Sequence, residues 1–78
     1  MHWTYRIKAA SRPKVLLRLV QLFEQHSLSL HTLELAVLKQ GVRITTTIEA
    51  TPELAKRLQA KLYAQIDVHE VELLPADA

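Results

Sequence analysis

The order in which the hydrophobic period changes along the chain limits the possible folds more than any other feature. Segments in which apolar residues alternate with polar ones predict half-buried strands, and segments in which they recur at helical spacing predict amphipathic helices. The segments follow one another as strand, helix, strand, strand, helix and strand. They cover 3–9, 16–23, 28–37, 42–48, 54–62 and 66–74. This order is that of a split βαβ unit, and it uses almost the whole chain.

We therefore predict an α+β fold of the ferredoxin-like βαββαβ type, with a four-stranded antiparallel sheet and both helices on one of its faces. The expected strand order across the sheet is fourth, first, third, second. The second strand is then an edge, and it is the strand richest in leucine. A long apolar edge favours pairing with a second copy. The predicted interface residues of this homodimer are Leu17, Leu28, Leu30, Leu33 and Leu35.

Local signals refine the ends of the elements. Ser11 is the expected N-cap of the first helix, with Pro13 at an early helical position, and Thr51 and Pro52 begin the second helix in the same way. The buried stripe of the first helix is expected to contain Val15, Leu16, Leu19, Val20 and Phe23, with Leu17 and Leu22 outside it.

Two strands change the parity of their apolar positions. In the second strand the change predicts a bulge near 31–32, and in the last strand it falls between Val68 and Val71. Gly41 is expected to supply the turn between the second and third strands, and 75–78 are expected to form a tail.

Size and composition favour one small domain over 1–78, the length of the chain. There is no cysteine, and the formal net charge is only +2, with acidic and basic residues interspersed.

No run approaches the roughly 20 apolar residues of a spanning helix. We expect a cytoplasmic protein with no membrane contact. The 49% apolar content is high for a small domain and indicates a partner surface.

Catalysis, metal binding and RNA binding have little support in the sequence. His26, His31 and His69 lack metal-ligand spacing, and no carboxylate pair is placed for general acid–base catalysis. We expect no catalytic residue, no metal and no cofactor. RNA-recognition modules of this topology stack bases on outward aromatic residues of the first and third strands. Here the outward positions hold only polar residues, namely Thr4, Arg6, Lys8, Arg43, Thr45 and Thr47.

The chain resembles an ACT domain, the small regulatory module attached to enzymes of amino-acid metabolism. The resemblance covers about 4–74 and rests on four short segments in a shared order. They are 12–16, 32–36, 50–52 and 66–68. Among ACT proteins the chain is most similar to the small regulatory subunits of acetolactate synthase of the isozyme II type.

The resemblance implies a regulatory role and no activity of its own. Such subunits bind a large thiamine-diphosphate-dependent subunit in branched-chain amino acid biosynthesis and activate it. In valine-sensitive relatives an amino-acid effector binds at the dimer interface, between the loop before the first helix and the start of the second strand. The matching positions here are Ser11, Lys14, Val15, Leu16, Ser29 and Leu30.

The chain departs from the effector-binding pattern. Relatives have Asn and, three residues later, Gly in the loop, where this chain has Ser11 and Lys14, and Ser29 replaces an Asn of the second strand. Glycine lets the backbone approach a ligand closely. We therefore expect activation of the large subunit with weak or no sensitivity to valine. The alternative is a free-standing ACT homodimer that binds an amino acid and regulates another enzyme.

Overall fold

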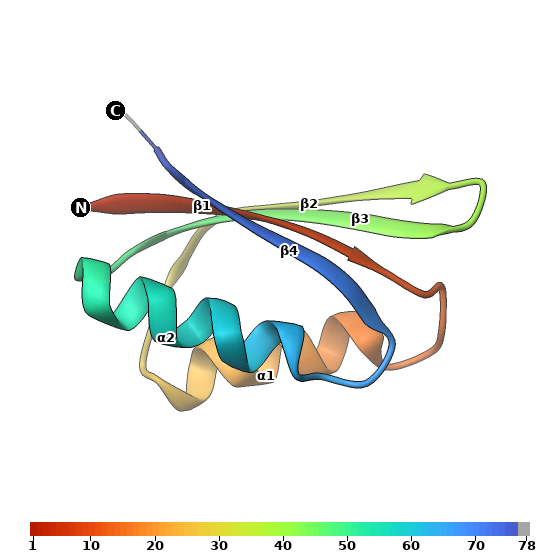
Figure 1. Ribbon diagram of the computed structural model, residues 1–78, viewed down its shortest axis with the longest axis horizontal. Coiled ribbons are helices and arrows are strands. Elements are labelled where there is room, and N and C mark those ends of the chain that lie inside the picture. Colours follow the sequence, from red (N-terminus) through yellow and green to blue (C-terminus); the bar gives the residue numbers. More distant parts are fainter. Residues whose placement is uncertain (77–78) are drawn as a thin grey trace.

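The computed structural model describes residues 1–76 and has six elements in the predicted order (Figure 1). Asp77 and Ala78, the last residues of the predicted tail, lie outside the described residues. The elements are β1 (His2–Ala9), α1 (Val15–Gln25), β2 (Leu30–Leu38), β3 (Gly41–Glu49), α2 (Pro52–Tyr63) and β4 (Val68–Pro75).

The four strands form one antiparallel sheet in the order β2-β3-β1-β4, which confirms the predicted topology. Both helices lie against the same face of the sheet, and the N-terminus and the C-terminal end of β4 lie at the same end of the molecule (Figure 1). The hairpin of β2 and β3 extends past the ends of the helices. The edge strands are β2 and β4.

The core lies between the sheet and the helices, and the alternation in β1 and β3 predicts its sheet side correctly. The inward residues are buried in both strands, and they are Trp3, Tyr5, Ile7, Ala9, Val42, Ile44, Thr46 and Ile48. Thr46 is the polar residue among them, and its hydroxyl donates a hydrogen bond to the carbonyl of Thr32 over 2.7 Å. The bond satisfies a group whose burial would otherwise cost free energy.

The start of α1 differs from the prediction. Lys14, not Ser11, is the N-cap residue; it adopts the left-handed conformation with φ 75°, and no side chain caps the helix. The helix begins at Val15, so Pro13 lies before it. The buried stripe holds Leu22 in place of Leu16 and Val20, which are only partly buried. Because the first helical residue is fixed by a backbone reversal at Lys14, no capping side chain in the sequence marks it.

The start of α2 confirms the prediction. The backbone N–H of Leu54 donates to the hydroxyl of Thr51 over 3.2 Å, and Pro52 occupies the first helical position. Glu53 adds a negative charge near the positive end of the helix dipole. Leu58 and Leu62 are fully buried against the sheet.

Both predicted irregularities are present in the edge strands. In β2, Leu30 pairs with Ile48 and Thr32 with Thr47, so His31 is an extra residue without a partner. In β4, Val68 pairs with Ala9 and Glu70 with Lys8, so His69 is likewise extra. Bulges of this kind redirect side chains at the edge of a sheet.

Candidate functional site

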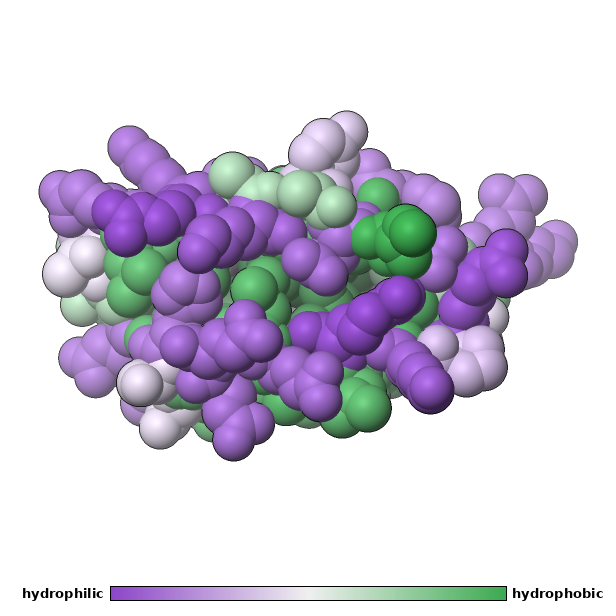
Figure 2. Space-filling model, turned by 90° about the horizontal axis from the view of Figure 1, so that it is seen from below, coloured by the Kyte–Doolittle hydropathy of each residue, from purple (hydrophilic) through white to green (hydrophobic). Residues whose placement is uncertain are grey.

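The edge strand β2 carries two leucines whose side chains are exposed to solvent. Leu33 and Leu35 are each 45% exposed although they share the inward face with Thr46 and Ile44, their partners in β3. β2 is an edge strand, so no further strand lies beside these two residues on its outer side. On the helical face of the molecule, apolar side chains are visible between the polar ones (Figure 2).

The five predicted interface residues divide into two groups. Leu17 on α1 is 53% exposed and, with Leu33 and Leu35, is open to a second chain. Leu28 and Leu30 are partly buried against the chain's own core. The predicted interface therefore includes three exposed side chains and two that already have intramolecular contacts.

The predicted effector-binding residues lie in two places within one chain. Ser11 and Lys14 are exposed in the loop before α1, where Val15 is buried and Leu16 is partly buried. Ser29 and Leu30 are at the other end of α1, beyond a helix of 11 residues that spans about 16 Å. A single chain does not bring the two groups together.

Charged contacts hold the loop before α1 in place. The carboxylate of Asp67, in the turn before β4, forms ion pairs with Arg12 over 3.4 Å and with Arg18 of α1 over 3.3 Å. The backbone N–H of Ala10 also donates to the carbonyl of Asp67 over 2.8 Å. Asp67 adopts a positive φ of 69°. The loop is therefore tied to the turn between α2 and β4, and Arg12 and Arg18 are already paired.

The outer face of the sheet, opposite the helices, carries both signs of charge. Arg6 lies 3.7 Å from Glu72, and Lys8 lies 3.3 Å from Glu70, each across the β1–β4 pair. The acidic partners on β4 offset part of the positive charge that would attract a phosphate backbone. No Phe, Tyr or Trp lies at an outward position of β1 or β3, and the imidazole of His2 is at the very start of β1, so the middle of the face offers no platform for base stacking.

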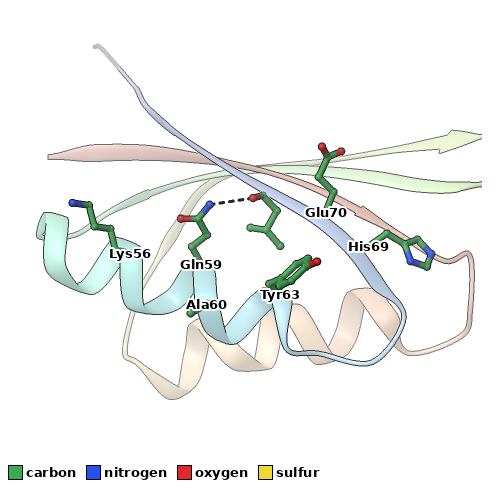
Figure 3. Close-up of a pocket in the computed structure, with 7 residues that line it drawn as sticks. Lys56, Gln59, Ala60, Tyr63, His69 and Glu70 are labelled. Atoms are coloured by element: carbon green, nitrogen blue, oxygen red, sulfur yellow. Dashed lines mark hydrogen bonds between the residues drawn. The ribbon is translucent and has the colours of Figure 1, made fainter.

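A shallow groove of about 420 Å³ runs between α2 and β4 (Figure 3). The side chain of Gln59 crosses it and donates to the carbonyl of Val71 over 3.1 Å, so α2 is tied to the edge strand. Tyr63 is 62% exposed beside it. The remaining lining residues are Lys56, Ala60, His69 and Glu70. The groove therefore lies between a helix and an edge strand of the sheet, and most of its lining residues have polar side chains.

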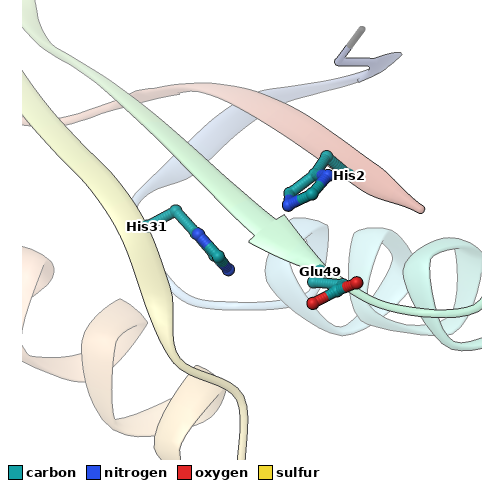
Figure 4. A group of neighbouring side chains, drawn as sticks. All are labelled: His2, His31 and Glu49. Atoms are coloured by element: carbon teal, nitrogen blue, oxygen red, sulfur yellow. The ribbon is translucent and has the colours of Figure 1, made fainter. Parts of the chain in front are cut away.

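A cluster that the sequence analysis missed lies at the end of the sheet where β2 begins. His2, His31 and Glu49 come from β1, β2 and β3 and place their potential ligand atoms within 4.8 Å of one another (Figure 4). The three positions are far apart in the sequence, and spacing rules detect only ligands that lie close together along the chain. The antiparallel pairing of His2 with Glu49 is the signal that could have found two of the three.

The fold is shared with several solved structures. The ACT domain from GTP pyrophosphokinase of Chlorobium tepidum has a TM-score of 0.81 at 16% identity, over 97% of this chain and 88% of that one. The C-terminal domain of the MgtC protein from Mycobacterium tuberculosis has a TM-score of 0.73 at 21% identity, over 94% and 84%. A homoserine dehydrogenase from Thiobacillus denitrificans has a TM-score of 0.76 at 24% identity, over 94% of this chain and 16% of that one.

The likeness to the GTP pyrophosphokinase domain establishes that the chain has the ferredoxin-like fold of ACT domains. No protein-family model matches the sequence, and no curated protein does. Among the described residues, no helix is long and apolar enough to cross a membrane.

Proposed function

We propose that this chain is a homodimeric regulatory module that binds and activates the large subunit of acetolactate synthase, with little or no response to valine. The observation that carries the proposal is the unpaired β2 edge with exposed leucines beside it. The choice of acetolactate synthase rests on the resemblance in the sequence, and the fold is consistent with a regulatory domain.

The dimer would pair the β2 edges of two chains. Leu33 and Leu35 have their backbones at an open edge and their side chains 45% exposed, and Leu17 on α1 is 53% exposed. Pairing the edges would satisfy the free backbone groups of β2 and cover these leucines at the same time. A twofold axis across the seam would join the two sheets into one, with all helices on one side.

An antiparallel seam would also complete the predicted effector site. β1 and β2 are parallel, because β3 lies between them and pairs antiparallel with both. The loop with Ser11 and Lys14 therefore lies toward the end of β2, whereas Ser29 and Leu30 lie at its start. In an antiparallel pair, the start of β2 in one chain would face the end of β2 in the other. The two halves of the site would then come from different chains.

The conformation of Lys14 supports weak sensing of an amino acid. Its φ of 75° is one that glycine adopts without strain, and the resemblance places glycine at this position in relatives that bind an effector. The backbone of the loop thus keeps a shape suited to glycine while a lysine side chain occupies it. That side chain would restrict the approach of an effector carboxylate to the N–H groups at the start of α1.

The test is reconstitution with the acetolactate synthase large subunit from the same source. We expect the activity of the large subunit to rise several-fold when this protein is added, and to change little with valine. Leu35→Glu should abolish the stimulation, whereas Ile66→Glu, which alters an even more exposed aliphatic residue away from the seam, should retain it. No stimulation by the wild-type protein would contradict the proposal and favour a free-standing module, for which an amino-acid binding screen is the next step.

A further inference from the structure

We propose that His2, His31 and Glu49 form a binding site for one divalent transition-metal ion such as zinc. The inference does not depend on the proposed regulatory function. It rests on the convergence of three side chains with metal-binding chemistry from three adjacent strands.

The strand register accounts for two of the ligands. His2 and Glu49 are direct partners in the β1–β3 pair, and both follow the outward parity, since their neighbours Trp3 and Ile48 are buried. The backbone of His2 is fixed on both sides, because Ala76 donates to its carbonyl over 3.0 Å and Ala50 donates to the carbonyl of Met1 over 2.9 Å. The two side chains therefore lie side by side on the outer face of the sheet.

The bulge in β2 accounts for the third ligand. β2 and β1 are separated by β3, so their backbones are about 9–10 Å apart. The ring centroids of His2 and His31 are nevertheless only 5.0 Å apart, at an interplanar angle of 86°. The rings lean toward each other near Glu49 (Figure 4). An extra residue in an edge strand is the kind of irregularity that redirects a side chain in this way.

The ligand set selects the class of metal. Imidazole nitrogens suit zinc, copper, nickel and iron, whereas magnesium and calcium favour sites made of oxygen ligands. Two histidines and one carboxylate are the protein ligands of several zinc sites that leave a fourth position open. Ligand atoms around tetrahedral zinc lie about 3.3 Å apart, given bond lengths near 2.0–2.2 Å. His31 and Glu49 are exposed and His2 only partly buried, so small side-chain rotations would bring the atoms from within 4.8 Å to that distance.

Metal binding at this site would connect β1, β2 and β3 at one end of the sheet. The three ligands are 29 and 18 residues apart in sequence, so an unfolded chain would not hold them together. Zinc would therefore bind the folded state in preference and raise the melting temperature.

The experiment uses the full chain without a histidine tag, because the site is next to the N-terminus. After treatment with EDTA, zinc chloride is titrated by calorimetry, and the melting temperature is recorded with and without zinc. We expect one zinc per chain and an increase in melting temperature. Each of His31→Ala and Glu49→Gln should weaken binding at least about tenfold, since losing even a residue that supports a ligand often costs that much. Magnesium should have no effect.

His69→Ala is the matched control, because His69 is also an exposed bulge residue on an edge strand, β4. It should bind zinc as the wild type does. In the unaltered protein, zinc should shift the side-chain nitrogen resonances of His2 and His31 and leave those of His26 and His69 in place, a result that needs no variant. Absence of a zinc-dependent melting shift, equal loss of binding in His69→Ala, or shifts spread over all four histidines would overturn the proposal.

Discussion

The hydroxyl of Tyr5 on β1 donates a hydrogen bond over 2.7 Å to the carbonyl of Ala55 on α2, in the middle of the core. The residue is fully buried, and its ring packs at 5.6 Å between centroids against that of Phe23 on α1. One side chain of the sheet therefore contacts both helices in the core. Burial raises the pKa of Tyr5 to about 12, because the charged phenolate loses its hydration there.

The raised pKa predicts a loss of stability in strong alkali. In the unfolded chain Tyr5 loses its proton near pH 10, whereas the folded protein holds it to about pH 12. The stabilising effect of Tyr5 is complete below pH 10 and declines above it, by up to about 1.4 kcal/mol per pH unit. Urea unfolding followed by the fluorescence of Trp3, the single tryptophan, measures this loss.

Tyr5→Phe separates this effect from the titration of other groups. It should lower the free energy of unfolding at neutral pH by about 1–2 kcal/mol, because the carbonyl of Ala55 loses a buried donor. Its stability should then fall less steeply than that of the wild type between pH 10 and 12. Parallel curves for the two proteins over that interval would show that Tyr5 is not the group responsible.

Gly41 should not tolerate a side chain. Its φ is 139°, and a Cβ atom at this position would lie 2.4 Å from the carbonyl oxygen of Ala9. Because both the backbone conformation and a neighbouring strand would have to shift, Gly41→Ala should lower the free energy of unfolding by about 2 kcal/mol or more. Gln40 in the same hairpin is exposed, so Gln40→Ala should change the free energy of unfolding by less than about 0.5 kcal/mol. Similar urea midpoints for the two variants would contradict this account of the turn.

Lys14→Gly should relieve strain and open the loop before α1. A residue other than glycine at φ 75° carries a conformational cost, so the variant should be more stable than the wild type by up to about 1 kcal/mol. Calorimetry should also detect stronger binding of a branched-chain amino acid, since glycine permits close approach of a carboxylate. Lys14→Ala removes the ammonium group but keeps a Cβ atom, and should give neither gain. If glycine and alanine have the same effect, the lysine acts through its charge and not through the backbone.

Much of the fold could be predicted because the hydrophobic period is regular in β1 and β3. Each inward residue from Trp3 to Ala9 and from Val42 to Ile48 is buried as expected. The bulge at His31 was also predictable, because a strand cannot bury leucines of both parities on one face without an extra residue. The cap of α2 follows from Thr51 and Pro52 in the same direct way.

Other features depend on information that the sequence pattern does not contain. α1 begins after a left-handed lysine, a conformation that the residue type does not favour, and Leu22 is buried because of how the helix is rotated on the sheet. The cluster of His2, His31 and Glu49 requires both the register of β1 on β3 and the position of the bulge in β2. Spacing along the chain cannot reveal a site that strand pairing creates.

The proposed function requires a dimer formed through the β2 edge, which can be detected from the mass of the protein in solution. Light scattering coupled to size-exclusion chromatography should give twice the 8.9 kDa of one chain for the wild type. Leu35→Glu should give a folded monomer, because a charge would be buried in the seam, and Ile66→Glu should remain a dimer. A wild-type protein that is monomeric at high concentration, or a Leu35→Glu variant of unchanged mass, would show that the chain does not dimerise through the β2 edge.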